Sequence, residues 1–181
     1  MNIWHDINPS RITPESFYVC IEISKGGKNK YELDKETGML CLDRVLYTST
    51  HYPANYGFIP LTFAEDDDPL DVLLLCSETI HPMTLVCCKP IGMIYMKDDN
   101  AIDEKIIAVP LRDPSYNGYN DISELPQHIF NEFANFFSVY KQLENITTSV
   151  EEVKGRESAL QVISRSIKRY REHFSGMYRE M

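Results

Sequence analysis

The sequence predicts an α+β protein that is mainly β, with a small closed or nearly closed sheet flanked by two helices in its C-terminal third. Two observations carry this prediction. Short apolar runs with the two-residue period of β-strands recur through the first two thirds of the chain. The final third changes to the helical period in two long segments.

The composition is that of one soluble domain. The chain has 181 residues, enough for one sizeable core and short for two, so we expect a single domain over residues 1–181. Lys and Arg number 18 against 27 Asp and Glu, a formal charge of -9. Because nucleic-acid binding depends on a basic surface, this balance disfavours a nucleic-acid partner. An anionic substrate would have to be attracted by bound metals or by a local cationic pocket.

The sequence contains no apolar run approaching the ~20 residues of a membrane-spanning helix. Its first residues lack the basic and apolar regions of a signal peptide. The cysteines are odd in number and form no CxxC pair; they are Cys20, Cys41, Cys76, Cys87 and Cys88. We therefore expect a cytoplasmic protein, with no membrane partner, whose cysteines are mostly buried free thiols.

The first strands alternate apolar and polar residues. Residues 17–23 are expected to form a strand with Glu22 on its polar face. After a turn, residues 30–34 resume the alternation with Lys30 and Glu32 on one face, and a hairpin loop then leads to Arg44. The mixed-charge face that these residues form is either a solvated surface, the commoner case, or the wall of a polar cavity.

The middle of the chain contains short runs separated by turn-forming residues. Residues 51–60 are dense in turn formers and aromatics and are interpreted as an ordered connection that holds Tyr56, with a packed surface loop as the favoured alternative. Strand-like runs follow at residues 71–76, 84–88, 91–97 and 104–109. The acidic patch between the last two is expected to be a solvated hairpin tip.

The final third places apolar residues at helical spacing over residues 126–143 and 157–174. Both stripes are interpreted as core-facing. Residues 145–156, between them, are interpreted as a polar linker.

Four carboxylates lie within six residues at Asp66-Asp67-Asp68-Pro69-Leu70-Asp71, directly before an apolar strand. Such a cluster is tolerable when cations neutralise it, and oxygen ligands suit Mg²⁺, Mn²⁺ or Ca²⁺. The spacing does not match an EF-hand loop, and neither His nor Cys shows the spacing of zinc ligands. The stretch therefore indicates a site for more than one divalent metal.

Several hard cations beside Lys, Arg and Tyr side chains point to phosphoryl chemistry. The sequence has no GxxxxGK[ST] loop and no GxSxG motif, and no Ser, His or Cys stands out as a nucleophile. The attacking group is then a water activated by metal.

At this point the chain resembles the soluble family I inorganic pyrophosphatases, in their short bacterial form. Residues 66–71 match the D-x-D-P-x-D signature of that family. The other matching motifs follow in order: Ile21-Glu22-Ile23, Lys30-Tyr31-Glu32, Asp43-Arg44, Tyr52-Pro53-x-Asn55-Tyr56-Gly57, Asp98 with Asp103-x-Lys105, and Tyr140-Lys141. The resemblance runs from about residue 17 to residue 143. One departure is Asp67, where the family often has glycine.

The resemblance implies an OB-like five-stranded β-barrel flanked by two C-terminal helices. It also implies hydrolysis of pyrophosphate to two orthophosphates with several Mg²⁺ ions per subunit, for which Mn²⁺ or Zn²⁺ could substitute. The short chain is similar to the branch that forms homo-oligomers, with a hexamer favoured.

The resemblance further implies a role for each matching residue. Asp68 corresponds to the general base. Asp66, Asp71, Asp98, Asp103 and Glu22 correspond to metal ligands, and Glu32 to the nearby acidic shell. The implied phosphate-binding set is Lys30, Arg44, Tyr56, Lys105, Tyr140 and Lys141.

Two other functions fit parts of the sequence. A non-catalytic calcium- or metal-binding protein would explain the acidic stretch but would leave Lys30, Arg44, Lys105 and Lys141 without a role. An OB-like nucleic-acid binder is opposed by the net charge.

Overall fold

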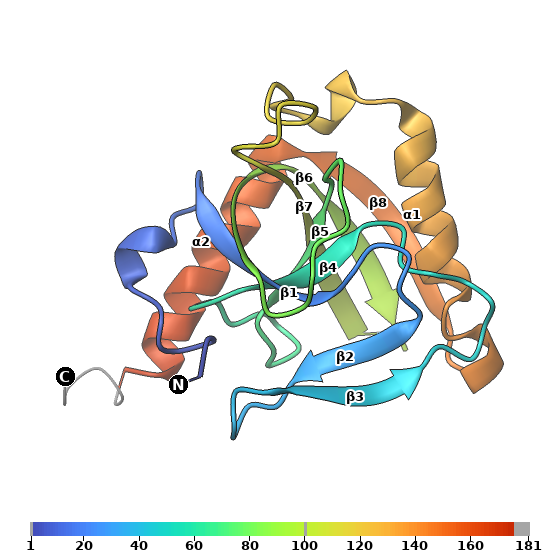
Figure 1. Cartoon of the computed structure of the whole chain (residues 1–181), viewed down its shortest axis with the longest axis horizontal. Helices are drawn as coiled ribbons and strands as arrows, with labels where there is room; N and C mark the ends of the chain where they lie inside the picture. The colour runs from blue at the N-terminus through green and yellow to red at the C-terminus, as the bar shows by residue number, and fades with distance from the viewer. Residues whose placement is uncertain (1, 100, 176–181) are drawn as a thin grey trace.

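A computed structural model describes residues 2–99 and 101–175. The strands are β1 (Phe17–Ile23), β2 (Asn29–Leu33), β3 (Leu40–Val45), β4 (Asn55–Ile59), β5 (Leu70–Leu74), β6 (Leu85–Asp98), β7 (Ala101–Pro110) and β8 (Thr148–Gly155). The α-helices are α1 (Gln127–Val139) and α2 (Arg156–His173), and the short 3-10 helices are η1 (Pro9–Arg11), η2 (Ile122–Glu124) and η3 (Gln142–Glu144). Figure 1 shows the strands in the centre of the molecule with α1 and α2 on two different sides.

Hydrogen bonding closes five strands into a ring. The sheet runs in the order β1-β4-β5-β7-β6, and β1 also pairs with β6, which joins the two ends. The pair β5–β7 is parallel and the other pairs of the ring are antiparallel. The predicted closed five-stranded sheet with two C-terminal helices is confirmed.

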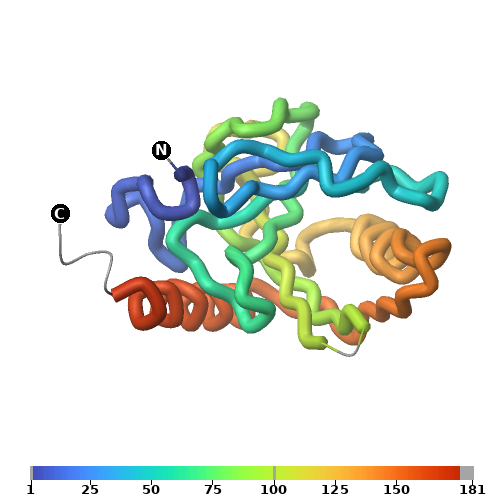
Figure 2. Tube along the Cα trace, turned by 90° about the horizontal axis from the view of Figure 1, so that it is seen from below, coloured from blue at the N-terminus to red at the C-terminus, as the bar shows by residue number. Residues whose placement is uncertain are grey.

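The hairpin β2–β3 lies outside this ring. Its two strands form a separate two-stranded sheet, and an irregularity between Lys30 and Tyr31 shifts its register. In Figure 2 the hairpin crosses the molecule on the side opposite α2. The predicted strand at residues 30–34 is therefore confirmed as a hairpin strand that packs against the ring.

One strand of the ring lies in the segment for which a packed surface loop was the favoured interpretation. All residues of β4 are buried, and it pairs with both β1 and β5. The interpretation as a loop is wrong for residues 55–59, which pair on both sides, and Gly57 allows this close approach of β4 to β1. A Cβ atom at this position would lie 1.9 Å from the backbone oxygen of Cys20 on β1.

Two predicted runs, 84–88 and 91–97, form the single long strand β6. Pro90 interrupts the pattern in the sequence, but the register shifts between Pro90 and Gly92, so a bulge accommodates it. The strand continues past this bulge to Asp98.

The prediction of a polar linker at residues 145–156 is also wrong, because β8 occupies most of that segment and pairs with β6. The pairing skips one residue, since Tyr95 pairs with Glu152 and Met96 with Val150. This irregularity lets Val150 and Val153 both pack against the core although they are three positions apart. A search for the two-residue period of a strand therefore misses β8.

Both predicted helices exist and bury apolar stripes. On α1, the buried residues are Phe130, Phe133, Phe136 and Phe137. The helix ends before Leu143, which is 63% exposed and is not part of the stripe as predicted. On α2, Ile163, Ile167 and Tyr170 are buried among residues that include Trp4 and Phe63.

The five cysteines are free thiols, but they are not all buried. Cys20 and Cys88 are buried, whereas Cys41 on β3 is exposed, which corrects the expectation for that residue. Within residues 2–99 and 101–175, no helix combines the length and apolarity needed to cross a bilayer.

Candidate active site

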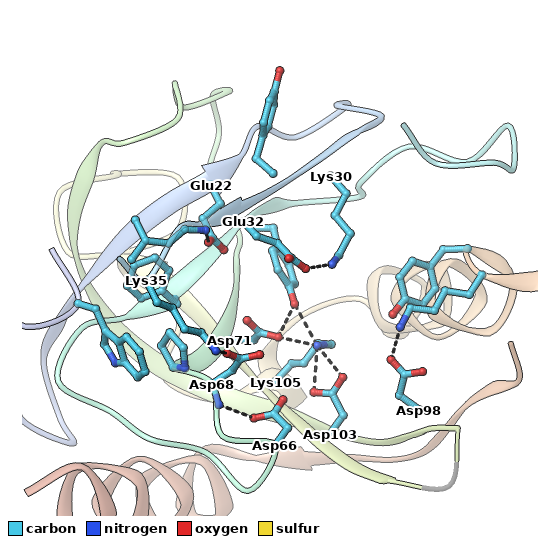
Figure 3. Close-up of a pocket in the computed structure, with 18 residues that line it drawn as sticks. Glu22, Lys30, Glu32, Lys35, Asp66, Asp68, Asp71, Asp98, Asp103 and Lys105 are labelled. Carbon is cyan, nitrogen blue, oxygen red and sulfur yellow. Dashed lines mark hydrogen bonds and ion pairs between the residues drawn. The ribbon is translucent and has the colours of Figure 1, made fainter. Parts of the chain in front are cut away.

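A polar cavity of about 310 Å³ opens beside the ring, between the hairpin β2–β3, the loop before β5 and the ends of β6 and β7. Figure 3 shows its carboxylates and ammonium groups pointing toward one another. The residues predicted for the site that line it are Glu22, Lys30, Glu32, Tyr56, Asp66, Asp68, Asp71, Asp98, Asp103, Lys105, Tyr140 and Lys141. The alternative of a polar cavity for the mixed-charge face is thus the correct one.

A tight loop presents the first acidic residues. The backbone N–H of Ala64 donates to the carbonyl of Asp68 at 2.8 Å, and the N–H of Asp68 donates to the carboxylate of Asp66 at 3.2 Å. Asp67 adopts a φ of 64°, in the left-handed region that Asp tolerates better than most residues. The aspartates on either side of it are thereby directed into the cavity.

Lys105 on β7 is the best buried charge of the site, with a residue exposure of 3%. Its Nζ donates to Asp71 at 2.7 Å, to Asp103 at 3.0 Å and to the hydroxyl of Tyr56 at 3.0 Å. The tyrosine hydroxyl in turn donates to Asp71. Burial by itself lowers the pKa of Lys105, but the charges of Asp103 and Asp71 outweigh it and raise that pKa well above its usual value.

Parallel pairing of β5 with β7 explains this arrangement. Asp71 and Lys105 are register partners on the two strands. Their side chains therefore point to the same face of the ring. Asp103 lies two residues before Lys105 and so shares its face.

Glu22 on β1 is buried and accepts a hydrogen bond from the N–H of Leu33 at 2.8 Å. Burial and the nearby charge of Asp71 raise the pKa of Glu22 to about 8. Burial and repulsion from Asp71 and Asp103 also raise the pKa of Asp66, to about 6. Burial, with the charges of Asp71 and Asp98, raises the pKa of Asp103 although Lys105 opposes the change. Burial is the largest cause in all three, and neighbouring carboxylates add to it.

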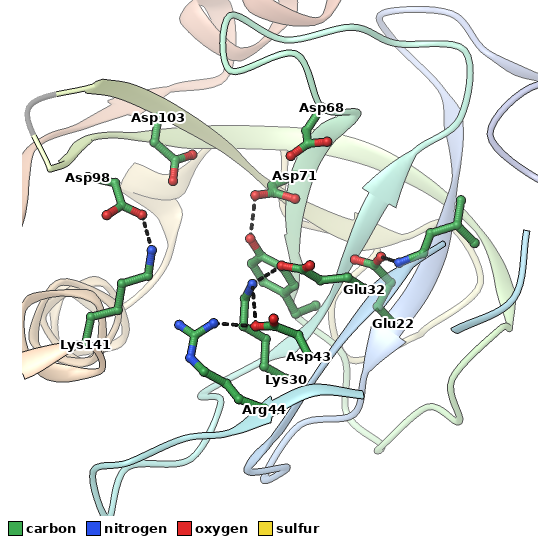
Figure 4. A network of polar contacts seen from close by, with 12 residues as sticks. Glu22, Lys30, Glu32, Asp43, Arg44, Asp68, Asp71, Asp98, Asp103 and Lys141 are labelled. Carbon is green, nitrogen blue, oxygen red and sulfur yellow. Dashed lines mark hydrogen bonds and ion pairs between the residues drawn. The ribbon is translucent and has the colours of Figure 1, made fainter. Parts of the chain in front are cut away.

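The hairpin contributes a chain of alternating charges, shown in Figure 4. Lys30 pairs with Glu32, on the same strand, and with Asp43 at 3.5 Å, and Arg44 pairs with Asp43. Among the residues predicted for the site, Arg44 is the one that does not line the cavity in the described part of the chain. Its guanidinium lies on the same side as Lys30 and Lys141 (Figure 4).

Another wall of the cavity is formed by the tip of β6–β7 and the segment that follows α1. Lys141 forms an ion pair with Asp98. Burial raises the pKa of the Tyr140 hydroxyl beside them. The acidic patch at residues 97–105 is therefore not simply a solvated hairpin tip, since Asp98 and Asp103 line the cavity.

Sequence reasoning did not assign six residues of the cavity wall to the site: Trp4, Tyr31, Leu33, Lys35, Phe58 and Pro69. Trp4 and Lys35 also lie outside every matching motif. Lys35 pairs with Asp68 (Figure 3). The Lys35 ammonium lies 5.7 Å from the centre of the Trp4 ring. Neither residue belongs to a run with a periodic pattern. Their proximity depends on the fold, because the backbone carbonyl of Lys35 accepts a hydrogen bond from the side chain of Asn2.

The donor chemistry of the cavity fits divalent metals. The carboxylates that line it are Glu22, Glu32, Asp66, Asp68, Asp71, Asp98 and Asp103, and the ammonium groups are Lys30, Lys35, Lys105 and Lys141. With every group ionised, seven carboxylates against four ammonium groups would leave an excess of three negative charges. Divalent cations bound by oxygen ligands would offset that excess.

The present arrangement is not a closed ligand cage. In the described residues, no three His, Cys, Asp or Glu side chains converge as a ligand set. Instead, the ammonium of Lys105 forms ion pairs with both Asp71 and Asp103.

Comparisons with known proteins agree with this site. The model of the family described as inorganic pyrophosphatase matches residues 19–171, which extends well past residue 143. The chain is 46% identical to soluble inorganic pyrophosphatase 2 of Chlamydomonas reinhardtii over 94% of this chain and 89% of that protein. It is 43% identical to the inorganic pyrophosphatase of Aquifex pyrophilus over 93% of this chain and 97% of that protein.

The fold matches as well. The crystal structure of the inorganic pyrophosphatase from Thermus thermophilus superposes with a TM-score of 0.90 at 34% identity, covering 94% of this chain and 99% of that one. Sequence, fold and cavity thus lead to one conclusion. The chain belongs to the inorganic pyrophosphatase family.

Proposed function

We propose that this protein hydrolyses inorganic pyrophosphate to two orthophosphates and that it uses Mg²⁺ to do so. The observation that carries the proposal is the cavity itself, in which carboxylates suited to hard cations lie beside lysines suited to phosphate oxygens. Family membership supports the same activity.

Metal ions would be held by Asp66, Asp71, Asp98, Asp103 and Glu22. When bound, they would acidify the attacking water and neutralise charge on the phosphate oxygens. Mn²⁺ or Zn²⁺ could take the same oxygen ligands. The excess negative charge of the cavity and the raised pKa values of Glu22, Asp66 and Asp103 support this assignment.

The remaining roles, which are proton acceptance and phosphate binding, belong to side chains of the protein. Asp68 accepts the proton of the attacking water, the role that its match to the family motif implies, and it lines the cavity with a half-exposed carboxylate that water can reach. Lys30, Arg44, Tyr56, Lys105, Tyr140 and Lys141 bind phosphate oxygens and stabilise charge that develops on the leaving phosphate. Glu32 orients Lys30, with which it is paired.

The test is phosphate release from pyrophosphate by the purified protein. We expect release with Mg²⁺, none with EDTA, and none from ATP under the same conditions. Strong Ca²⁺ binding without phosphate release, by folded protein and across several divalent metals, would instead support a metal-binding relative that has lost its chemistry.

We also propose that residues 1–181 form one domain, that the protein works in the cytoplasm, and that it assembles as a homo-oligomer with a hexamer favoured. The resemblance of this short chain to oligomeric pyrophosphatases supports the assembly. Light scattering on the purified protein measures its mass, and a monomer at micromolar concentration would contradict it.

A further inference from the structure

Arg44 is held by a residue that none of the family motifs above contains. Its Nε lies 3.0 Å from both Oε1 and Oε2 of Glu144, a residue 100 positions away. Both side chains are largely buried, with exposures of 20% for Arg44 and 13% for Glu144. This pair is therefore better shielded from water than ordinary surface ion pairs, which contribute little.

The backbone around Glu144 is shaped for this contact. Glu144 is the last residue of η3, and its N–H donates to the carbonyl of Lys141 at 2.9 Å. Asn145 then ends η3 in the left-handed region with a φ of 59°, which Asn tolerates better than most residues. The turn that follows Tyr140 and Lys141 thus directs Glu144 toward the hairpin β2–β3.

The pair also decides how the guanidinium is presented. Glu144 engages the Nε side of Arg44, and Asp43 engages Nη1. In the part of the chain that the structure describes, these contacts leave the donors at Nη2 for another acceptor. A guanidinium held at Nε and at Nη1 can offer its donors at Nη2 to a phosphate oxygen in a defined direction.

We propose that Glu144 is a positioning residue that holds Arg44 toward the phosphate-binding side of the cavity and couples the hairpin β2–β3 to the segment carrying Tyr140 and Lys141. The proposal rests on the function proposed above. Glu144 touches no reacting atom and acts through Arg44.

The kinetic test compares Glu144→Ala with Glu144→Gln. We expect Glu144→Ala to raise the KM for pyrophosphate about tenfold and to change kcat by less than about threefold, because a disordered guanidinium weakens binding more than chemistry. Glu144→Gln keeps an acceptor for Nε and should stay within about threefold of the wild-type KM. Glu151→Ala, at an exposed acidic residue of β8, is the matched control and should leave both constants unchanged.

A double-mutant comparison distinguishes positioning of Arg44 by Glu144 from direct binding of pyrophosphate by Glu144. In an Arg44→Met background, Glu144→Ala should change KM by less than about twofold. A tenfold rise that persists in this background would overturn the proposal, and so would a wild-type KM for Glu144→Ala.

A second readout does not depend on activity. The ¹H–¹⁵N signal of Arg44 Nε–H, assigned by its loss in Arg44→Met, should be retained in Glu144→Gln and shifted or broadened in Glu144→Ala. An unchanged signal in Glu144→Ala would overturn the proposal. If wild-type protein released no phosphate while this signal responded as expected, the proposed function would fail and the anchoring of Arg44 by Glu144 would stand.

Discussion

The two sides of the cavity hold their charges in different ways. On the ring side, formed by Tyr56, Asp71, Asp103 and Lys105, the ammonium group is buried and has several hydrogen-bond partners. On the loop side, formed by Lys35 and Asp68, the two paired side chains are 54% and 52% exposed. Both sides contain a lysine paired with an aspartate, and their surroundings differ.

Because of this difference, the two sides of the cavity should contribute unequally to the stability of the folded protein. A buried charge whose partners are also buried is expensive to disturb, because each partner left behind is costly. An exposed pair contributes little to stability and can rearrange easily when a ligand arrives. We therefore expect ring-side substitutions to affect folding strongly as well as the reaction, and loop-side substitutions to affect the reaction alone.

The largest effect is expected for Asp68→Asn on the loop side. Loss of the general base should lower kcat by about 10²- to 10⁴-fold, while the urea midpoint of unfolding stays near that of the wild type because the side chain is half exposed. Steady-state kinetics and urea unfolding on the same preparation check the expected loss of kcat and the expected unchanged midpoint. Full activity in this variant would remove Asp68 from its assigned role.

On the ring side, Lys105→Met should lower the free energy of unfolding by about 3 kcal/mol, because it leaves Asp71, Asp103 and Tyr56 without their shared donor. Urea denaturation followed by the fluorescence of Trp4 measures the change. A loss below about 0.5 kcal/mol would contradict the expectation that ring-side substitutions strongly destabilise the fold.

Mg²⁺ should stabilise the folded protein, since it would offset the excess negative charge of the cavity. At a concentration about 100 times its Kd, a ligand that binds only the folded state contributes about 2.7 kcal/mol. Thermal unfolding with Mg²⁺, and again with EDTA, measures this shift, and Asp71→Asn should reduce it. The same Tm in both buffers would argue against a metal site in the cavity.

The smallest effect is expected for Lys35→Met, which makes the same substitution as Lys105→Met on the other side of the cavity. Because the pair of Lys35 with Asp68 is half exposed, the free energy of unfolding should change by less than about 0.5 kcal/mol. Urea unfolding alongside Lys105→Met tests the comparison directly. Equal losses in the two variants would contradict it.

Sequence reasoning reached further for the site than for the strands. The residues expected at the site were found through short motifs, and all except Arg44 line one cavity. Short motifs identify these residues because binding of metals and phosphate requires particular side chains. Strands β4 and β8 were missed because a close-packed glycine and a register irregularity both conceal the period of two.

The sequence by itself determined the fold class, the two helices and the chemical character of the site, because apolar period and residue type are local properties of the chain. Only the tertiary structure decided which charges are buried and which residues meet over long separations. Lys105 is the central donor because β5 and β7 run parallel, and Arg44 is paired with Glu144 because η3 turns toward the hairpin. Burial and long-range pairing depend on strand register and on the packing of distant segments, which no local pattern encodes.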